Sequence, residues 1–120
     1  MATLVPTLTL TSSDATSEAL NLSVTDSLTV TIPAIGISRV TITTDDNQEL
    51  VDEAISGVKY FYAKNIDETN FVVLQTTASV QYARLSPGEF AFFPINDGAG
   101  LEAIADTASC ILEYAYWTKG

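Results

Sequence analysis

Apolar side chains alternate with small polar ones along the first third of the chain. Leu, Val and Ile occupy even positions from Leu4 to Leu10 and again from Leu20 to Ile32, while Thr or Ser fills most of the odd positions. A period of two is typical of a β-strand with one buried face, and no helix produces it. We therefore predict strands over both segments, with Leu4, Leu8 and Leu10 packed inward.

The opposite face of these strands carries short uncharged side chains where a solvated sheet usually carries Lys and Glu. The first 44 residues contain only Asp14, Glu18, Asp26 and Arg39 as charged groups. Thr packs well on a pleated surface and loses little entropy when it is covered. We expect this surface to contact another protein. The interface candidates also include Leu4 of the apolar face and Trp117 of the last predicted strand, and in full they are Leu4, Val5, Thr7, Thr9, Thr11, Thr29, Thr31 and Trp117.

Clear turn signals begin after Thr44. A polar bend at residues 45–48 precedes residues 49–56, which fit either a short edge strand or one helical turn. Residues 58–65 form an aromatic strand with apolar groups on both faces, which predicts a central position in a sheet. The Asn- and Asp-rich segment 65–70 then predicts a hairpin between this strand and the strand at 71–75.

Four further strands complete the pattern, and they are expected at residues 80–85, 90–95, 101–105 and 110–117. Between the first two of these, Pro87 and Gly88 have the residue types of a type II turn, in which Gly adopts a positive φ. Eight or nine short strands without an amphipathic helix predict an all-β, antiparallel sandwich, jelly roll or barrel. A chain of 120 residues forms a single domain, 1–120.

Charge and hydropathy exclude several partners. The net charge is −10, from 15 carboxylates against five basic residues, so phosphate groups would be repelled and no nucleic acid is expected. No apolar run approaches the roughly 18 to 20 residues that cross a bilayer, so no membrane is expected. Residues 1–13 contain no Lys or Arg, and we expect no secretory signal there.

Catalytic and metal-binding patterns are nearly absent. The chain has no His, which removes the commonest general base and the commonest transition-metal ligand. Asp45, Asn47 and Glu49 have the spacing that begins a calcium loop, but Leu50 and Ser56 stand where that loop needs Gly and Glu. We therefore expect a solvated acidic turn there, no cofactor, no metal and no enzymatic activity.

Two remaining motifs have simple structural explanations. Asn21-Leu22-Ser23 matches a glycosylation acceptor, but it lies inside a predicted strand. Cys110 cannot form an internal disulfide because it is the only cysteine. No basic residue adjoins it in sequence, so we expect a small core hydrophobe and no reactive thiol.

The aromatic residues allow two interpretations. They could stack on sugars, as in a carbohydrate-binding module, or they could anchor the core and a subunit interface, and the second interpretation is favoured. On the last strand, Tyr114 and Tyr116 share one face with Cys110, and Trp117 lies on the other. The residues in question are Tyr60, Tyr62, Phe92, Tyr114, Tyr116 and Trp117.

Several of these segments occur in an order that resembles small virion proteins of tailed bacteriophages. The resemblance covers roughly residues 57–117, and it rests on four motifs: Gly57-Val58-Lys59-Tyr60-Phe61-Tyr62-Ala63-Lys64-Asn65, Asp67-Glu68-Thr69-Asn70-Phe71-Val72, Arg84-Leu85-Ser86-Pro87-Gly88-Glu89-Phe90-Ala91-Phe92-Phe93 and Leu112-Glu113-Tyr114. The resemblance implies a β-sandwich, often of jelly-roll type, in a capsid, neck or tail, without enzymatic activity. It implies no active site.

The acidic composition favours the outer capsid surface over the side that faces packaged DNA. We therefore expect a capsid decoration or cement protein, a homotrimer that contacts the major capsid protein or other virion proteins. Residues 1–12 are expected to act as an attachment strand. The alternatives are a neck, tail or fibre component and a carbohydrate-binding module for host attachment.

Overall fold

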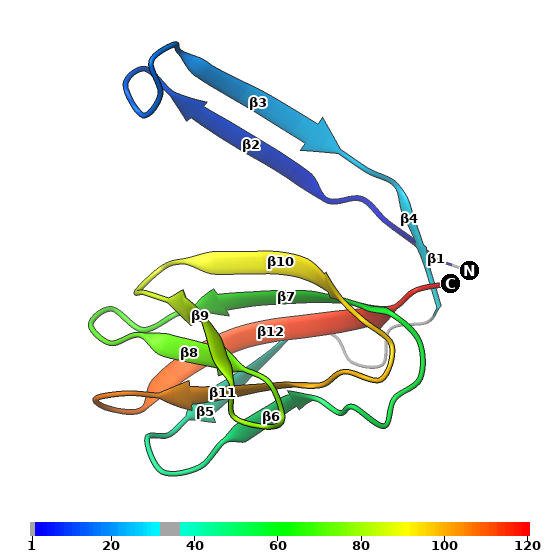
Figure 1. The fold of residues 1–120 in the computed structure, drawn as a ribbon, viewed down its shortest axis with the longest axis vertical. Coiled ribbons are helices and arrows are strands. Elements are labelled where there is room, and N and C mark those ends of the chain that lie inside the picture. Colours follow the sequence, from blue (N-terminus) through cyan, green and yellow to red (C-terminus); the bar gives the residue numbers. More distant parts are fainter. Residues whose placement is uncertain (1, 32–36) are drawn as a thin grey trace.

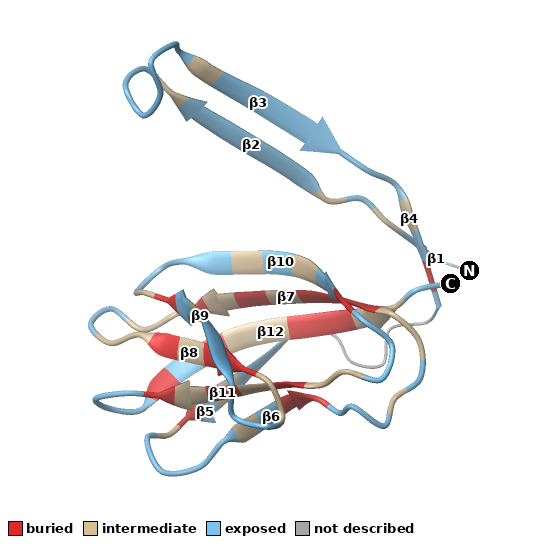
Figure 2. Cartoon of the chain, viewed as in Figure 1, coloured by how far each residue is buried: buried red, intermediate tan, exposed pale blue. Residues whose placement is uncertain are grey.

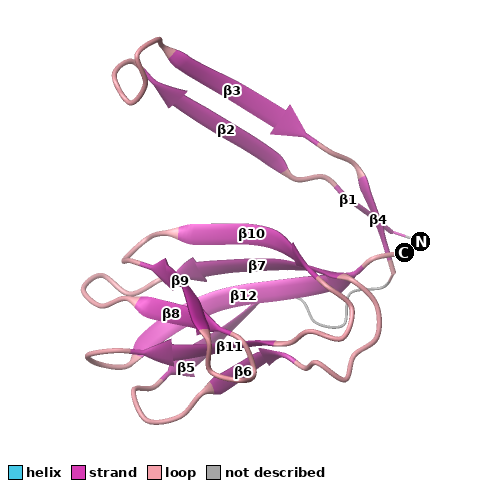
Figure 3. Ribbon diagram, in the orientation of Figure 1, coloured by secondary structure: helices cyan, strands magenta, loops and turns pink. Residues whose placement is uncertain are grey.

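The computed structural model describes residues 2–31 and 37–120, so the end of the second predicted strand, at Ile32, lies outside the described residues. Over the described part, the chain forms twelve β-strands (Figure 3), and none of its segments is a helix long and apolar enough to cross a membrane. The strands are β1 Ala2–Leu4, β2 Thr7–Ser12, β3 Leu20–Thr25, β4 Leu28–Val30, β5 Ser38–Ile42, β6 Gln48–Val51, β7 Lys59–Asn65, β8 Val72–Gln75, β9 Gln81–Leu85, β10 Phe90–Ile95, β11 Leu101–Ala105 and β12 Cys110–Thr118.

Eight of these strands build a sandwich of two antiparallel sheets, with the orders β10-β7-β12-β5 and β6-β11-β8-β9 (Figure 1). Strand β5 pairs with β12, β6 with β11, β7 with β10 and β8 with β9. The chain from β5 to β12 is thus one long antiparallel ribbon wrapped across two sheets, which is the arrangement of a jelly roll. The predicted all-β sandwich is confirmed, but the strand number is larger than eight or nine, because each of the two predicted N-terminal strands is divided in two and Ser38–Ile42 forms a further strand.

The hydrophobic core lies between the two sheets (Figure 2), where alternate residues of each strand point inward. Phe61 on β7 is fully buried at its centre, with its ring 5.5 Å from that of Phe93 and 6.5 Å from that of Tyr114. The other sheet contributes small and branched side chains, including Val72, Leu74 and Ala103.

Strand β7 occupies the central position that its composition predicts, between β10 and β12. The predicted hairpin between β7 and β8 is wrong, because β8 belongs to the other sheet and pairs with β9 and β11. The turn itself forms, since the Asp67 carboxylate accepts hydrogen bonds from the backbone N–H groups of Thr69 and Asn70. These local hydrogen bonds hold the Asp67 pKa below its usual value. They set the bend but leave the pairing partner of the next strand undetermined.

Asn65 links the two sheets at this end of the sandwich. Its buried side-chain amide donates hydrogen bonds to the carbonyl oxygens of Asn70 and Leu85, both at 2.9 Å, and its side-chain oxygen accepts one from Asp67 N at 2.9 Å. Because its side-chain donors and acceptor are occupied, the buried amide carries little desolvation cost.

The structure decides between the two alternatives for residues 49–56. Strand β6, Gln48–Val51, is an edge strand of the second sheet, and the residues after it form a turn. At the other predicted turn, Gly88 has a φ of 79° and Glu89 N donates to Ser86 O at 2.9 Å. These values confirm the type II turn.

Strands β1 to β4 form a two-stranded ribbon that projects from the sandwich (Figure 1), and we call residues 2–30 the arm. Strand β1 pairs with β4 and β2 pairs with β3. The radius of gyration, 15.5 Å, exceeds the value of about 13.6 Å expected for a compact domain of this length, as a projecting ribbon requires.

The prediction that Leu8 and Leu10 pack inward is therefore wrong. Their side chains are 42% and 43% exposed, and on the paired strand Leu22 and Val24 are 40% and 50% exposed. Leu4, nearer the sandwich, is only half-buried. The alternation correctly predicts two strands with one apolar face, but a two-stranded ribbon outside the sandwich has no second layer to cover that face.

We predict that Gly88→Val lowers the free energy of unfolding by about 1 to 2 kcal/mol, because a β-branched residue is strained at positive φ. Nothing lies within 4 Å of the Cβ position, so strain of the backbone is the only expected cost. Gly88→Asn, which tolerates this conformation, is the matched control and should retain most of the stability. Denaturant titrations measure both, and equal losses for Val and Asn would contradict the explanation.

Candidate functional site

The end of β12 anchors the base of the arm. Thr31 N donates to Thr118 O at 2.9 Å and Gly120 N donates to Thr29 O at 2.8 Å, and an antiparallel bridge joins Val30 to Lys119. Val30 is 2% exposed at this junction. The base is thus an extension of the sandwich, whereas strands β2 and β3 extend away from it (Figure 1).

The ribbon is interrupted between its base and its outer part. Val5 and Pro6 separate β1 from β2, and Asp26 and Ser27 separate β3 from β4. Asp26 N donates to Pro6 O at 3.2 Å, which keeps the two strands together across the break. Pro6 lacks an N–H group, so regular pairing cannot continue through this point. The break sets the direction of the outer ribbon.

An aromatic surface covers the outer face of the β10-β7-β12-β5 sheet on the side of the arm. Residues of β10 and β7 with the same orientation lie opposite one another, as in the pairs Phe92–Tyr62 and Phe90–Lys64. The Phe92 and Tyr60 rings stack with centroids 6.5 Å apart and planes inclined by 15°. Phe90 is 65% exposed, which is unusual for so large an apolar side chain.

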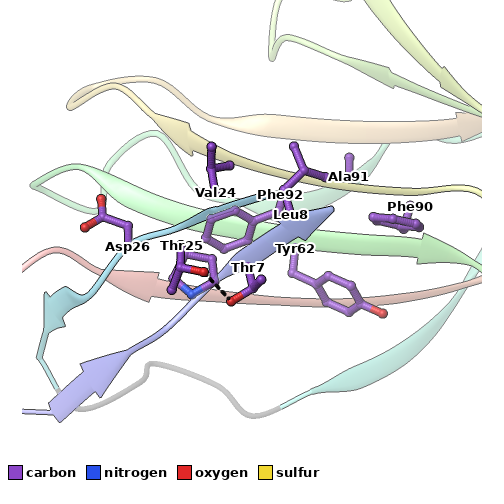
Figure 4. Close-up of a pocket in the computed structure, with 10 residues that line it drawn as sticks. Thr7, Leu8, Val24, Thr25, Asp26, Tyr62, Phe90, Ala91 and Phe92 are labelled. Atoms are coloured by element: carbon purple, nitrogen blue, oxygen red, sulfur yellow. Dashed lines mark hydrogen bonds between the residues drawn. The ribbon is translucent and has the colours of Figure 1, made fainter. Parts of the chain in front are cut away.

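A groove of about 760 Å³ lies between the arm and this surface (Figure 4). Among the described residues that line it, only Asp26 is charged, and the Thr7 and Thr25 hydroxyl groups are hydrogen-bonded to each other at 3.1 Å. The groove is therefore suited to an apolar segment with few charges. It is lined by Pro6, Thr7, Leu8, Val24, Thr25, Asp26, Tyr62, Phe90, Ala91 and Phe92.

A polar network fixes the orientation of Tyr62 in the groove. The Tyr62 hydroxyl donates to Glu113 Oε1 at 2.9 Å, and Arg39 forms an ion pair with Glu113 Oε2 at 3.3 Å. Burial, followed by the hydrogen bond to the Glu113 carboxylate, raises the pKa of Tyr62 above its usual value. Tyr62 therefore remains neutral at physiological pH and presents its ring to the groove.

The predicted interface residues all lie on the arm or at its base. Val5, Thr7, Thr9, Thr11, Thr29 and Thr31 are exposed, while Leu4 and Trp117 are half-buried. Only Thr7 among them lines the groove. Thr29 and Thr31 make backbone hydrogen bonds that anchor the arm.

Other side chains of the groove were missed by the prediction. Leu8 was assigned to the core, Val24 was not considered as an interface residue, and Phe90 was treated only as part of a strand. The signal for Phe90 was present in the sequence, because Phe90, Phe92 and Pro94 occupy one face of β10 and Ala91, Phe93 and Ile95 occupy the other. When a strand has large apolar residues on both faces, each face is either buried in the fold or exposed on the surface.

The other candidate residues are placed as follows. Tyr114 and Tyr116 belong to the core side of β12, together with Cys110, whereas Trp117 lies on the outer side. Asn21 is exposed in β3. Within the described ranges, no three Asp, Glu or Cys side chains are grouped as metal ligands. At the acidic turn, Asn47 donates a hydrogen bond to Ser79 Oγ.

Neither the protein-family models nor the curated proteins that were compared with this chain match it.

We predict that Cys110 does not react with thiol reagents in the folded protein. The side chain is 1% exposed, and burial, together with the nearby Asp67 carboxylate, raises its pKa, so little thiolate forms at neutral pH. An aromatic disulfide reagent should modify it only after denaturation. A stoichiometric reaction in native buffer would contradict this placement.

We also predict that the outer part of the arm can be removed without unfolding the sandwich. Residues 7–25 would be replaced by Asn-Gly, a two-residue turn that can join Pro6 to Asp26, whose backbones are hydrogen-bonded. The deleted residues contribute nothing to the core cluster, so the thermal midpoint should change by only a few degrees. Calorimetry and circular dichroism measure this, and loss of the cooperative transition would show that the arm belongs to the folding unit.

Proposed function

We propose that this chain is a structural protein of a bacteriophage particle, a decoration or cement protein that stabilises the outer capsid surface by protein–protein contacts. The observation that supports this proposal most strongly is the arm, a projecting β-ribbon with an uncovered apolar face. Burying a Val or Leu side chain completely contributes about 1.5 to 3 kcal/mol, so covering side chains that are 40–50% exposed contributes about 1 kcal/mol each. An exposed apolar surface of this kind is typical of a binding site for another protein.

The proposed partners are the major capsid protein or another virion protein, together with further copies of this chain in a homotrimer. An isolated two-stranded ribbon is marginally stable in water, so an arm that forms part of an assembly gains stability from its neighbours. The net charge of −10 supports an exterior position, because packaged DNA would repel the protein. The same charge argues against nucleic acid as a partner.

We propose no enzymatic activity and no cofactor. The chain has no His, and the groove beside the arm is lined mainly by apolar side chains with one carboxylate, Asp26. General acid–base catalysis usually depends on a titratable pair within reach of a bound substrate. A groove of this composition is better suited to binding than to chemistry.

Two alternatives stay open to experiment. A neck, tail or fibre component would use the arm in the same way on a different partner. A carbohydrate-binding module would use Tyr62, Phe90 and Phe92 as a stacking platform. The sugar alternative is weaker because Thr7 and Thr25 bond to each other, which leaves few polar groups to bind sugar hydroxyls.

The test compares the wild-type protein with the variant in which residues 7–25 are replaced by Asn-Gly. Shells of the parent phage that lack this protein should bind the wild type and should lose at least ten-fold in affinity for the variant, measured by co-sedimentation. Asn21→Ala with Ser23→Ala, on the other face of the ribbon from Leu8 and Leu10, is the matched control and should bind more tightly than the deletion variant.

Several outcomes would contradict the proposal. Full binding of the deletion variant to shells would exclude the arm as the attachment element. Binding of the wild type to isolated tails but not to shells would assign it to the tail, and a specific signal on a glycan array that is lost on Phe90→Ala would favour the carbohydrate-binding alternative.

A further inference from the structure

Two apolar surfaces of this chain are uncovered and complementary. The first is the apolar face of the outer arm, formed by Leu8, Leu10, Leu22 and Val24, which lie opposite one another in the pairs Leu8–Val24 and Leu10–Leu22. The second is the aromatic surface of the groove, where Phe90 and Phe92 are 65% and 38% exposed. Contact between two surfaces of these kinds removes apolar side chains from water and is therefore favourable.

The arm of the same chain leaves the groove open. Its base is held by the backbone hydrogen bonds from Thr31 to Thr118 and from Gly120 to Thr29, so the position of the base is set by the end of the chain. Strands β2 and β3 extend from there as a continuous ribbon with its own pairing (Figure 1). Leu8 and Val24 line the edge of the groove, whereas Leu10 and Leu22, further along the ribbon, do not line it.

The base of the arm, unlike its outer part, is already covered. Val30 of β4 is 2% exposed where its bridge to Lys119 joins the arm to the sandwich. On the outer face of the sheet, Tyr60 is 7% exposed and its ring stacks on that of Phe92. The uncovered apolar surface therefore consists of the outer part of the arm and of Phe92 and Phe90 on β10.

The charge distribution allows a second copy to approach through the arm and the groove. With a net charge of −10, two copies repel each other over most of their surface. Strands β2, β3 and β10 contain no charged residue, so contact between arm and groove brings no carboxylates of these strands together. The chain therefore carries both an uncharged apolar ribbon, strands β2 and β3, and a mainly apolar groove with one lining carboxylate, Asp26, into which such a ribbon can pack.

We propose that the arm of a second copy of this chain occupies the groove, with Leu10 and Leu22 packed on Phe90 and Phe92 of the first copy. This inference rests on the homo-oligomer proposed above and is independent of the shell. The arm and the groove are different surfaces, so each copy can give its arm to one neighbour and receive an arm from another. Such contacts form a closed ring when three copies take part, and with two copies each arm occupies the groove of the other copy.

The experiment uses two single-cysteine variants of the full chain in a Cys110→Ala background, Leu10→Cys with a mass tag and Phe90→Cys without one. The two are mixed at micromolar concentration without phage particles, treated with a short bismaleimide and analysed by mass spectrometry. The expected product is a covalent heterodimer that joins position 10 of one copy to position 90 of the other. Ser23→Cys, on the opposite face of the ribbon, is the matched control and should give at least a five-fold lower yield.

The double variant with Leu10→Cys and Phe90→Cys on one chain separates exchange from closure of the chain's own arm. A product of monomer mass from this variant, with no heterodimer from the mixture, would show closure and overturn the proposal. The proposal would also be overturned if the protein sediments as a monomer and the mixture gives no heterodimer. It would likewise be overturned if the protein is an oligomer but the control variant and Leu10→Cys give equal yields of cross-linked heterodimer. Heterodimer formation without shell binding would support arm exchange and contradict the shell role.

A second variant tests the same contact without chemical modification. Leu10→Ser combined with Leu22→Ser should shift the wild-type oligomer to monomer in sedimentation, with the circular dichroism of the sandwich retained. Asn21→Ala with Ser23→Ala, on the opposite face of the ribbon, should leave the oligomer intact. Retention of the oligomer by the Leu10 and Leu22 variant would overturn the proposed contact.

Discussion

The pairing between the end of β12 and the base of the arm is the constraint on which the candidate site depends. Strand β12 is the longest in the described part of the chain, with nine residues, and it pairs with both β5 and β7 before its last residues reach the arm. Thr118 and Gly120 then hold Thr31 and Thr29 by backbone hydrogen bonds. A strand fixed on both sides is rigid, so it transmits the orientation of the sandwich to the arm. Without this pairing, the ribbon would have no defined position relative to Phe90 and Phe92, and no groove would exist.

Strand β7 connects the core to this groove because it carries aromatic side chains on both faces. Phe61 points into the core between the sheets, while Tyr60 and Tyr62 point to the outer face. The start of the strand is secured by Lys59, a fully buried residue whose Nζ donates to Ile55 O at 2.6 Å. A buried ammonium group is costly unless it is hydrogen-bonded, so this contact ties the 52–57 turn to the sandwich. The same strand therefore stabilises the fold and supplies one wall of the groove.

The sequence predicts well those features that local chemistry determines. The central position of β7 follows from apolar residues on both faces, and the turn at Gly88 follows from its neighbour Pro87. The pairing of β8 could not be predicted in this way, because the turn after Asn65 is formed by local hydrogen bonds that are compatible with either sheet. The exposure of Leu8 and Leu10 could not be predicted either. Alternation identifies a strand and its apolar face, but whether a second layer covers that face depends on residues far away in the sequence.

The acidic composition of the chain bears on the specificity of binding as well as on solubility. Carboxylates on the remaining surface oppose non-specific contacts between copies and with other acidic proteins, since like charges at an interface are unfavourable. Strands β2, β3 and β10 carry no charged residue, so carboxylates of these strands do not oppose a contact there. The proposed association would therefore meet less repulsion at the arm and the groove than at an acidic part of the surface. An added charge at Phe90 would weaken association by more than the lost apolar area alone, because it would extend the repulsive surface into the groove.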